Sequence, residues 1–246
     1  MTRTLLTGLV PEAAITAEKF GDIPDAWIFP EETAVLGRAA HGRREEFATV
    51  RHCARVALTS LGRPAGPMVP GVGGAPTWPE GVVGSMTHCD GYRAAAVCRR
   101  IDVAALGIDA EPHAPLPPGL LRRIASPSER GRLAMLRQKR PALHWDRLLF
   151  SAKESVYKAW FPLTGTWLDF REAELVIDPY RRTFHARLLR SGRDDEGRPL
   201  HSLHGRWRID RRLVVTATTH RVTDSVLGAG ARVRRHTTPR NEDGTR

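Results

Sequence analysis

The segment of residues 150–160, FSAKESVYKAW, places the strongest constraint on how this chain can fold. It contains neither Gly nor Pro, and its aromatic side chains recur at helical spacing, which predicts an α-helix. At about 100° per residue, Phe150 and Tyr157 share one face, which should be buried. Lys153 and Glu154 project within or beside the same arc. Charged groups on a buried face are costly unless something compensates them, so this helix should border a site.

The lysines of the chain are concentrated in this helix. The sequence has 38 Lys and Arg residues, and only Lys19, Lys139, Lys153 and Lys158 among them are lysines. Lys differs from Arg in being a compact point charge that can donate or hold a proton. The alternative interpretation is an ordinary i,i+4 ion pair between Glu154 and Lys158 on a solvated helix face.

A second segment, LGIDAEP at residues 106–112, reads as a strand with two carboxylates. Strand side chains alternate between faces, so Asp109 and Glu111 point the same way. Two carboxylates on one face repel each other unless a cation lies between them. With Glu154 as a third oxygen ligand they would form a Mg²⁺-type site. The alternative is that both carboxylates face solvent at the end of the strand.

A third segment, GSMTHCDG at residues 84–91, offers Thr87 and His88. Neighbouring strand residues point to opposite faces, so His88 and Cys89 cannot readily pair as base and nucleophile, and G-x-S-x-G is absent. Together His88 and the Thr87 hydroxyl could contact a phosphate. The alternative is a histidine whose hydrogen bonds are satisfied at a strand end.

The pattern along the chain predicts an α+β fold made of two similar halves. A Pro-rich connector, PHAPLPPG, gives the boundary between residues 1–113 and 114–227, and residues 228–246 read as a disordered polar tail. Ser126 is a predicted N-cap, followed by Pro at the first helical position. We expect helices at residues 43–60, 126–137 and 144–161, and strands at 82–88, 92–98, 103–111, 173–178, 183–190, 201–209 and 213–220.

The net charge of +11 indicates either an acidic partner or ligand or a coding bias toward arginine. Nucleic acid is one such partner, but the arginines are scattered, and no zinc-finger, basic-zipper or RNA-binding signature occurs. A phosphorylated cofactor or an acidic protein fits the charge equally well. Three cysteines without metal-type spacing indicate a reduced, cytoplasmic protein. There is no apolar run of membrane-spanning length and no convincing signal peptide.

In their order and chemistry, GSMTH, GIDAE and FSAKESVYK resemble the three-motif signature of the long, Sfp-type class of 4′-phosphopantetheinyl transferases. The THC and KES variants resemble the enterobactin-synthase-D-like branch. The resemblance implies transfer of phosphopantetheine from coenzyme A to a serine of an acyl or peptidyl carrier protein, with release of adenosine 3′,5′-bisphosphate. It also implies a pseudo-dimer of two α+β halves, with coenzyme A and Mg²⁺ in the cleft between them.

The resemblance also implies roles for individual residues. Asp109, Glu111 and Glu154 would hold the metal, and Glu154 would be the base for the carrier serine. Lys158 would neutralise the transferring phosphoryl group. The remaining contacts with coenzyme A would come from Arg43, Arg51, Thr87, His88 and Lys153.

One departure from the family pattern is Pro70, near a position where relatives often carry a basic phosphate contact. The expected partners are coenzyme A and acidic carrier proteins, with no nucleic acid and no membrane, and the protein is expected to be a monomer. Two alternatives stay open: a Mg²⁺-dependent phosphohydrolase, which would share the carboxylates, and a basic nucleic-acid-binding protein.

Overall fold

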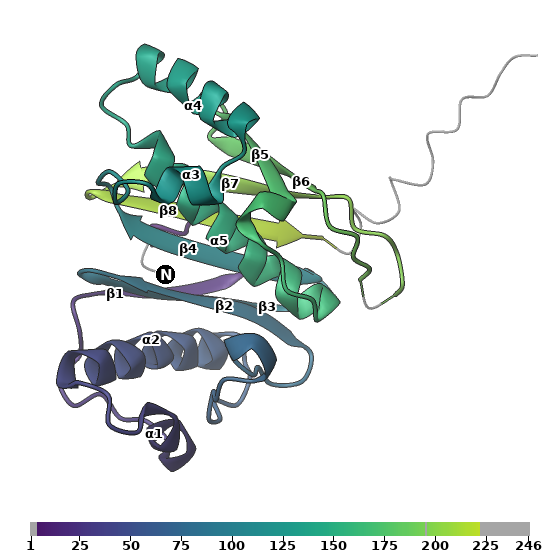
Figure 1. Cartoon of the computed structure of the whole chain (residues 1–246). Helices are drawn as coiled ribbons and strands as arrows, with labels where there is room; N and C mark the ends of the chain where they lie inside the picture. Colours follow the sequence, from purple (N-terminus) through teal and green to yellow (C-terminus); the bar gives the residue numbers. More distant parts are fainter. Residues whose placement is uncertain (1–3, 195, 222–246) are drawn as a thin grey trace, which may run out of the picture.

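A computed structural model describes residues 4–194 and 196–221 of the chain. The fold is α+β, as the sequence predicts, with a three-stranded and a five-stranded sheet. Figure 1 shows the two sheets stacked between two groups of helices. In the described residues no helix is both long and apolar enough to cross a membrane.

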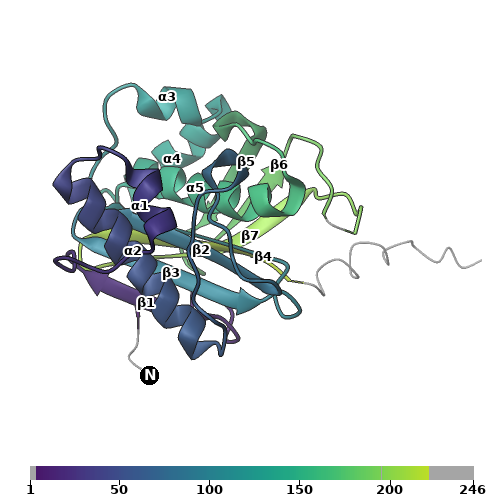
Figure 2. The same ribbon diagram turned by 90° about the horizontal axis from the view of Figure 1, so that it is seen from below.

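The three-stranded sheet has the order β1-β3-β2, and all its strands are antiparallel. The strands are β1 (Ile15–Phe20), β2 (Val82–Cys89) and β3 (Tyr92–Arg99). The long helix α2 (His41–Ser60) covers the outer face of this sheet, and the short α1 (Pro30–Leu36) lies beyond it (Figures 1 and 2). Small side chains on β3, such as Ala95, let α2 pack closely there.

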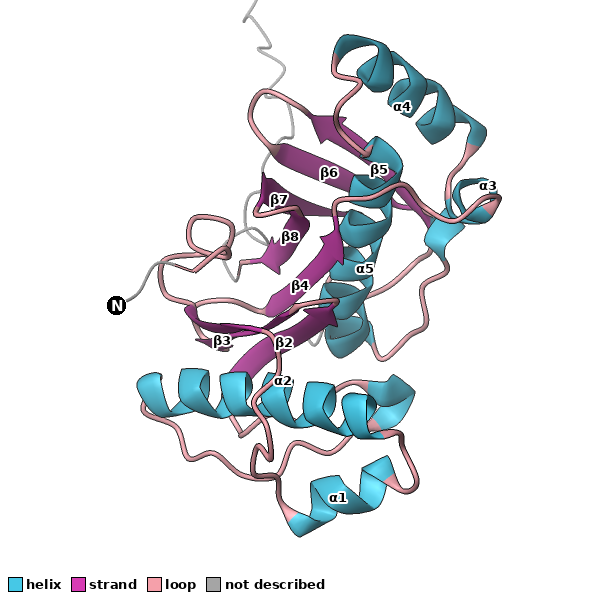
Figure 3. Cartoon of the chain, turned by 90° about the vertical axis from the view of Figure 1, so that its left-hand side faces the viewer, coloured by secondary structure: helices cyan, strands magenta, loops and turns pink. Residues whose placement is uncertain are grey.

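The five-stranded sheet has the order β4-β8-β7-β6-β5 and is also antiparallel. Its strands are β4 (Ala105–Pro112), β5 (Ala173–Asp178), β6 (Thr183–Leu188), β7 (Ser202–Asp210) and β8 (Leu213–His220). One face is covered by α5 (Trp145–Thr164), with α3 (Leu120–Ile124) and α4 (Pro127–Lys139) beside it (Figure 3). Buried Trp145 and Trp160 of α5 belong to this core.

Two hydroxyl groups join the sheets where β2 runs beside β4. The Ser85 Oγ accepts a hydrogen bond from the Ile108 amide at 3.0 Å. The Thr87 Oγ1 accepts one from the Ala110 amide at 2.9 Å. These amides would otherwise be buried without partners, which is costly. Side chains of β2 thus replace the backbone ladder that an ordinary neighbouring strand would supply, and they fix the register between the sheets.

Helix α5 packs on β4 at Gly107. A Cβ atom at this position would lie 2.0 Å from the Ser155 carbonyl oxygen and 2.7 Å from the Ala159 nitrogen. Only glycine allows the backbones to approach this closely. The next residue on the same face of β4 is Asp109, so the close approach also brings α5 onto the carboxylate.

The predicted elements are largely confirmed. The strands at 173–178 and 213–220 match β5 and β8, and Ser126 caps α4 through a capping box with Glu129. Helix α5 extends to Thr164 despite an internal Pro162. The sequence pattern missed β1, α1 and α3, together with the 3₁₀ turns Val72–Gly74 and Phe170–Glu172.

The division of the chain at residue 113 stays a prediction, as does the similarity of the two halves. Strand β4, which that division counts with the first half, is hydrogen-bonded to β8 of the second. The tail predicted for residues 228–246 lies outside the described residues.

We expect Gly107→Val to lower the free energy of unfolding by about 3 kcal/mol, because the added side chain meets backbone atoms that cannot move aside. Gly131→Ala is the matched control, since nothing lies within 4 Å of a Cβ there. In the interior of α4 that change should raise the unfolding free energy by about 0.5–1 kcal/mol. Urea unfolding of both variants measures the difference, and equal stabilities would contradict the close packing.

Candidate active site

A cavity of 630 Å³ lies between α2 and α5. Its wall also contains β2 and residues 70–78, and we call it the α2–α5 cavity. Figure 3 shows these two helices flanking the adjoining strands β2 and β4. Five of the residues predicted from sequence line it together: Arg43, Arg51, His88, Glu154 and Lys158.

Helical periodicity decides which charged residues of α5 reach the cavity. Glu154 and Lys158 are one turn apart and both line it, together with Tyr157 and Phe161. Lys153 precedes Glu154 by one residue, so its side chain leaves the helix about 100° away. Glu154 therefore faces the cavity, whereas Lys153 enters the core.

Lys153 is not brought to the cavity. Its Nζ is buried and lies 3.0 Å from a Glu129 carboxylate oxygen. It also donates to the carbonyl oxygens of Ile124, Phe170 and Ala173 at 2.6–2.9 Å. Burial lowers the pKa of Lys153, and the Glu129 carboxylate opposes that effect. The ammonium is saturated inside the protein, so the phosphate contact expected of Lys153 is not available in this arrangement.

Asp109 and Lys158 form an ion pair at the base of the site. The Lys158 Nζ lies 2.6 Å from Asp109 Oδ1 and also donates to the Ile108 carbonyl at 3.2 Å. Asp109 is buried. Its second oxygen, Oδ2, is buried with no hydrogen-bond partner among the described residues. An unsatisfied carboxylate oxygen is costly, so this one is poised to accept a ligand.

The other two carboxylates of the predicted triad stand nearby. Glu111 forms an ion pair with Arg147 at 2.8 Å. Burial, and then the charge of Asp109, raise the pKa of Glu111, and Arg147 counteracts them. The pKa of Glu154 is also raised, chiefly by burial, with Asp109 adding to the rise and Lys158 opposing it. Asp109 thus repels both of the other carboxylates.

The donor set fits a hard cation, although it is not assembled as a metal cage. No group of three His, Cys, Asp or Glu residues in the described part of the chain is already arranged to hold a metal. The orphaned Oδ2 of Asp109 and its repulsion of Glu111 and Glu154 are what a divalent cation would relieve. Mg²⁺ takes only one or two carboxylates with water and phosphate oxygens, so a preformed cage is not required.

Imidazole and guanidinium groups meet at the α2 end of the cavity. The Arg43 Nη1 lies 3.0 Å from His88 Nε2 and 3.2 Å from Glu46 Oε2. Burial, followed by the charge of Arg43, lowers the pKa of His88, and Glu46 opposes the shift. These cationic and imidazole groups suit an anionic ligand.

Arg51 lines the cavity but is largely committed to the protein. Its Nε donates to the Met68 carbonyl at 3.0 Å and lies 3.6 Å from the Glu32 carboxylate. The guanidinium stacks over the Phe47 ring, 3.2 Å from its centroid. Burial lowers the pKa of Arg51 to about 10. Arg51 therefore supports the wall of the cavity and adds positive charge from behind it.

Thr87 does not line the cavity. Its hydroxyl accepts from the Ala110 amide and donates to Asp109 Oδ1 at 3.4 Å. Strand alternation turns Thr87 toward β4, while His88 points to the α2 side. The two neighbours predicted to share a phosphate thus face opposite sides of the sheet.

Comparisons with known proteins identify the family of the chain. The family model for the 4′-phosphopantetheinyl transferase N-terminal domain matches residues 31–98. The model for the 4′-phosphopantetheinyl transferase superfamily matches residues 105–216.

The chain belongs to the 4′-phosphopantetheinyl transferase superfamily. It is 57% identical to the 4′-phosphopantetheinyl transferase Svp of Streptomyces mobaraensis, over 87% of this chain and 88% of that protein. It is 47% identical to PptT of Mycobacterium tuberculosis, over 88% and 96% of the two chains. It is 44% identical to Npt of Nocardia iowensis, over 88% of this chain and the full length of the relative. The protein is therefore a transferase that modifies carrier proteins with phosphopantetheine.

Sequence reasoning missed the apolar wall of the α2–α5 cavity. Residues 70–78 close one side of the cavity, with an isolated bridge between Pro70 and Pro76. Gly73 has φ of +66° and packs on Phe161, whose ring a Cβ would meet at 2.3 Å. The run GVGG carried a signal for this contact, because glycines in a loop often mark a close approach. Its partner on α5 could not be read from the sequence.

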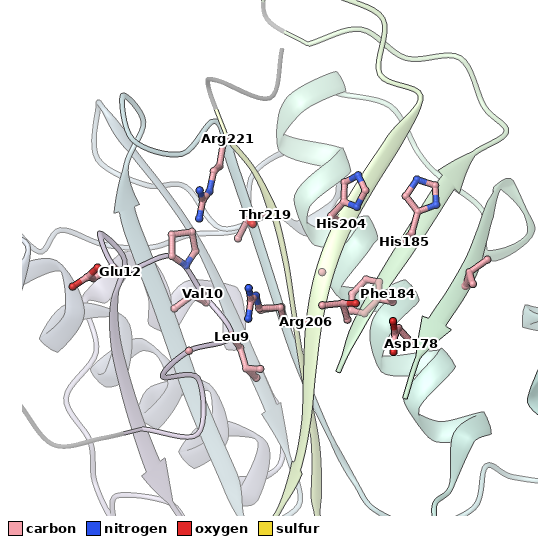
Figure 4. A pocket seen from close by; sticks show the side chains of 16 residues that line it. Leu9, Val10, Glu12, Asp178, Phe184, His185, His204, Arg206, Thr219 and Arg221 are labelled. Carbon is pink, nitrogen blue, oxygen red and sulfur yellow. The ribbon is translucent and has the colours of Figure 1, made fainter. Parts of the chain in front are cut away.

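A second cavity of 630 Å³ opens on the face of the five-stranded sheet away from α5 (Figure 4). His185 and His204 project into it side by side from β6 and β7, with ring centroids 4.8 Å apart. The described part of its wall contains no lysine. One carboxylate oxygen of Asp178, also in its wall, accepts hydrogen bonds from the amides of Tyr180 and Arg181. Residues of the GSMTH and FSAKESVYK segments line the α2–α5 cavity instead, whereas Asp109 and Glu111 of GIDAE do not.

We expect Lys153→Met to lower the free energy of unfolding by about 3–5 kcal/mol, because it leaves the Glu129 carboxylate buried without its partner. Lys139→Met, at the exposed end of α4, is the matched control and should leave stability nearly unchanged. Chemical denaturation measures both variants. A Lys153→Met protein of normal stability but weakened coenzyme A binding would instead support the phosphate contact predicted for Lys153 from the sequence.

Proposed function

We propose that this transferase moves 4′-phosphopantetheine from coenzyme A to a serine hydroxyl of an acyl or peptidyl carrier protein and releases adenosine 3′,5′-bisphosphate. The observation that carries this proposal is the meeting of Glu154 and Lys158 with the Arg43 and His88 groups in one cavity. A carboxylate and an ammonium stand at one end of the cavity, and anion-binding groups line the other. Such an arrangement suits an elongated substrate with separate phosphate groups.

Mg²⁺ is the metal we propose for the carboxylate end, held by Asp109, Glu111 and Glu154. When bound, it would neutralise the pyrophosphate oxygens of coenzyme A. The free Oδ2 of Asp109 supports this assignment. The other oxygen of Asp109 is paired with the Lys158 ammonium at 2.6 Å. The carboxylate can therefore keep this ion pair through Oδ1 while Oδ2 accepts the metal.

Glu154 is the proposed base for the carrier serine. The new bond joins the serine oxygen to the β-phosphorus of coenzyme A, and the bond to the leaving adenosine bisphosphate breaks. The serine proton passes to the Glu154 carboxylate, directly or through a water molecule. Its raised pKa makes Glu154 a stronger base than an ordinary glutamate, which suits proton transfer near neutral pH. Lys158 neutralises charge on the phosphoryl group as the leaving oxygen departs.

The adenosine 3′-phosphate belongs at the α2 end, against Arg43 and His88. Arg51 contributes its charge from the wall, and it holds the segment that leads into residues 70–78 through Met68. We assign no phosphate contact to Thr87 or Lys153, because both are bonded within the protein.

Carrier proteins that are acidic around the modified serine would be drawn to this cationic chain by long-range attraction. We propose that they dock on the side of α3 and α4, where Arg122, Arg123 and Arg137 are exposed. The Arg171 side chain donates to the Arg122 and Arg123 carbonyls. It thereby connects α3 to the 3₁₀ turn Phe170–Glu172. The protein would act as a monomer in the cytoplasm, where its three cysteines, all free and buried, stay reduced.

Glu154→Gln and Asp109→Ala should each abolish transfer without unfolding the protein, because each removes a charged oxygen from the metal and base site. Incubation with coenzyme A, Mg²⁺ and a panel of carriers, followed by intact-mass analysis, measures transfer as a gain of about 340 Da. Glu172→Gln, which changes a partly buried carboxylate paired with Arg190, is the control and should retain activity. Near wild-type transfer by either site variant would refute the assignment.

The same assay distinguishes the alternative functions. A phosphohydrolase would release adenosine bisphosphate without a carrier, whereas this transferase should release it only when a carrier is present. Binding that follows DNA rather than coenzyme A would favour the nucleic-acid alternative.

Removing two charges at α3 should raise the KM for the carrier with little change in kcat, because charge governs encounter more than chemistry. Arg122→Ala/Arg123→Ala is the test, and Arg181→Ala/Arg182→Ala on the β5–β6 turn removes the same charge elsewhere. High salt should raise the carrier KM of the wild type. It should also reduce the difference in carrier KM between the two double variants. Equal KM values for both pairs at low salt would exclude α3 as the docking surface.

A further inference from the structure

Glu46 stands between the cationic groups that we assign to the 3′-phosphate. Its Oε2 lies 3.2 Å from Arg43 Nη1 and 4.0 Å from His88 Nδ1. Its other oxygen, Oε1, lies 3.2 Å from Arg93 Nη2. A carboxylate in an anion-binding site is unexpected, since it repels the ligand. It therefore requires a reason.

Arg93 holds the Glu46 carboxylate in place. Arg93 is buried, and its guanidinium also forms two hydrogen bonds of 2.8 Å with Asp22. It donates further to the carbonyls of Cys89 and Tyr92. With Arg93 fixed on β3, Glu46 cannot swing away when an anion arrives, and its second oxygen stays beside His88.

The hydrogen bond between Arg43 and His88 fixes the protonation state of the ring. A guanidinium can only donate, so His88 Nε2 must accept at 3.0 Å and carry no proton. The single ring proton of the neutral imidazole then lies on Nδ1, the nitrogen nearest Glu46. In the free protein the ring is neutral, and its Nε2 is turned toward the place of the expected phosphate.

We propose that binding of the 3′-phosphate of coenzyme A is coupled to the uptake of one proton by His88, and that Glu46 is the positioning residue that makes this uptake possible. The inference rests on the proposed function and concerns how the same site recognises its substrate. On binding, the phosphate takes over the Arg43 donor, and a proton from solvent occupies His88 Nε2. The resulting imidazolium donates to the phosphate through Nε2 and faces Glu46 through Nδ1.

The charges around His88 set the sign of this coupling. Arg43 and Glu46 on α2, Lys158 on α5 and Arg93 on β3 are the charged groups that act on the ring. Three are cations that oppose its protonation, and only Glu46 favours it. Together with burial, the cations hold the pKa of free His88 below its ordinary value. A phosphate dianion reverses this balance, so the pKa of His88 rises in the complex.

The pH dependence follows from that rise. The proton is taken up at pH values between the lowered pKa of free His88 and the raised pKa of the complex. Coenzyme A affinity should therefore fall as pH increases through that window, because binding and protonation favour each other. A coenzyme A analogue without the 3′-phosphate should show no such dependence.

Calorimetric titration with coenzyme A, in buffers of different ionisation enthalpy, measures the protons taken up. We expect about one proton per coenzyme A near pH 7.5, where a phosphate monoester with a second pKa of about 6 is already a dianion. Titration with 3′-dephospho-coenzyme A in the same buffers subtracts any proton exchange at the carboxylate end. The His88→Asn protein should take up the same number of protons with coenzyme A as with 3′-dephospho-coenzyme A.

Glu46→Gln separates positioning from simple electrostatics. We expect its KM for coenzyme A to rise about threefold to tenfold at pH 8 and much less at pH 6, with kcat changed far less, because one pKa unit corresponds to tenfold in affinity. The KM for 3′-dephospho-coenzyme A should not change. Glu45→Gln is the matched control, since Glu45 has nearly the same side-chain exposure, 26% against 27%, and pairs with His41 instead.

Two results would overturn the inference. One is equal proton uptake with coenzyme A and its 3′-dephospho analogue. The other is a Glu46→Gln protein whose KM for coenzyme A falls at every pH, which would make Glu46 only a repulsive charge. Either result would leave the transferase activity in place, whereas failure of the proposed function would appear as no transfer to any carrier by the wild type.

Discussion

The site depends on the close contact between α5 and β4 at Gly107. Because the backbones nearly touch there, the next outward residue of β4, Asp109, meets Lys158 at 2.6 Å. Lys158 neutralises one oxygen of Asp109, and the other oxygen has no hydrogen-bond partner in the part of the chain that the structure describes. Glu154, one turn earlier on the helix, then faces the same cavity. A side chain at position 107 would separate the groups that have to act together.

Helix α5 carries two lysines whose surroundings show how burial divides structural from chemical roles. Lys153 is enclosed by Glu129 and three carbonyl oxygens, so its hydrogen bonds are made within the protein. Lys158 is half-exposed, has one carboxylate partner and faces the cavity. A buried ion pair is stable only when all its hydrogen bonds are made, whereas a residue in a binding site keeps the capacity to change partners.

The site draws on both sheets, and hydroxyl groups of β2 keep them in register. Ser85 and Thr87 bind amides of β4, and this fixes the position of the β4 carboxylates relative to the neighbouring His88. The α2 end of the cavity and its carboxylate end are thereby set at a constant separation. Such a frame suits the substrate that we propose, which carries phosphates at two places.

The sequence by itself determined most of the helices and strands and which charged residues share a face. Alternation placed Asp109 and Glu111 on one face of a strand, and helical spacing placed Glu154 and Lys158 together, because both patterns are local properties of the backbone. The motifs also resembled the family to which the chain belongs.

The tertiary structure decided what each side chain meets. Periodicity gives the direction of a side chain but not the element opposite it, so the cage around Lys153 could not be foreseen. The same holds for Thr87, which joins the sheets, for Arg147 beside Glu111, and for Arg51, which is held by a carbonyl. These partners lie between 17 and 36 residues away in sequence. Such contacts arise only when segments distant in sequence pack together, because packing between distant segments has no signature in a local pattern.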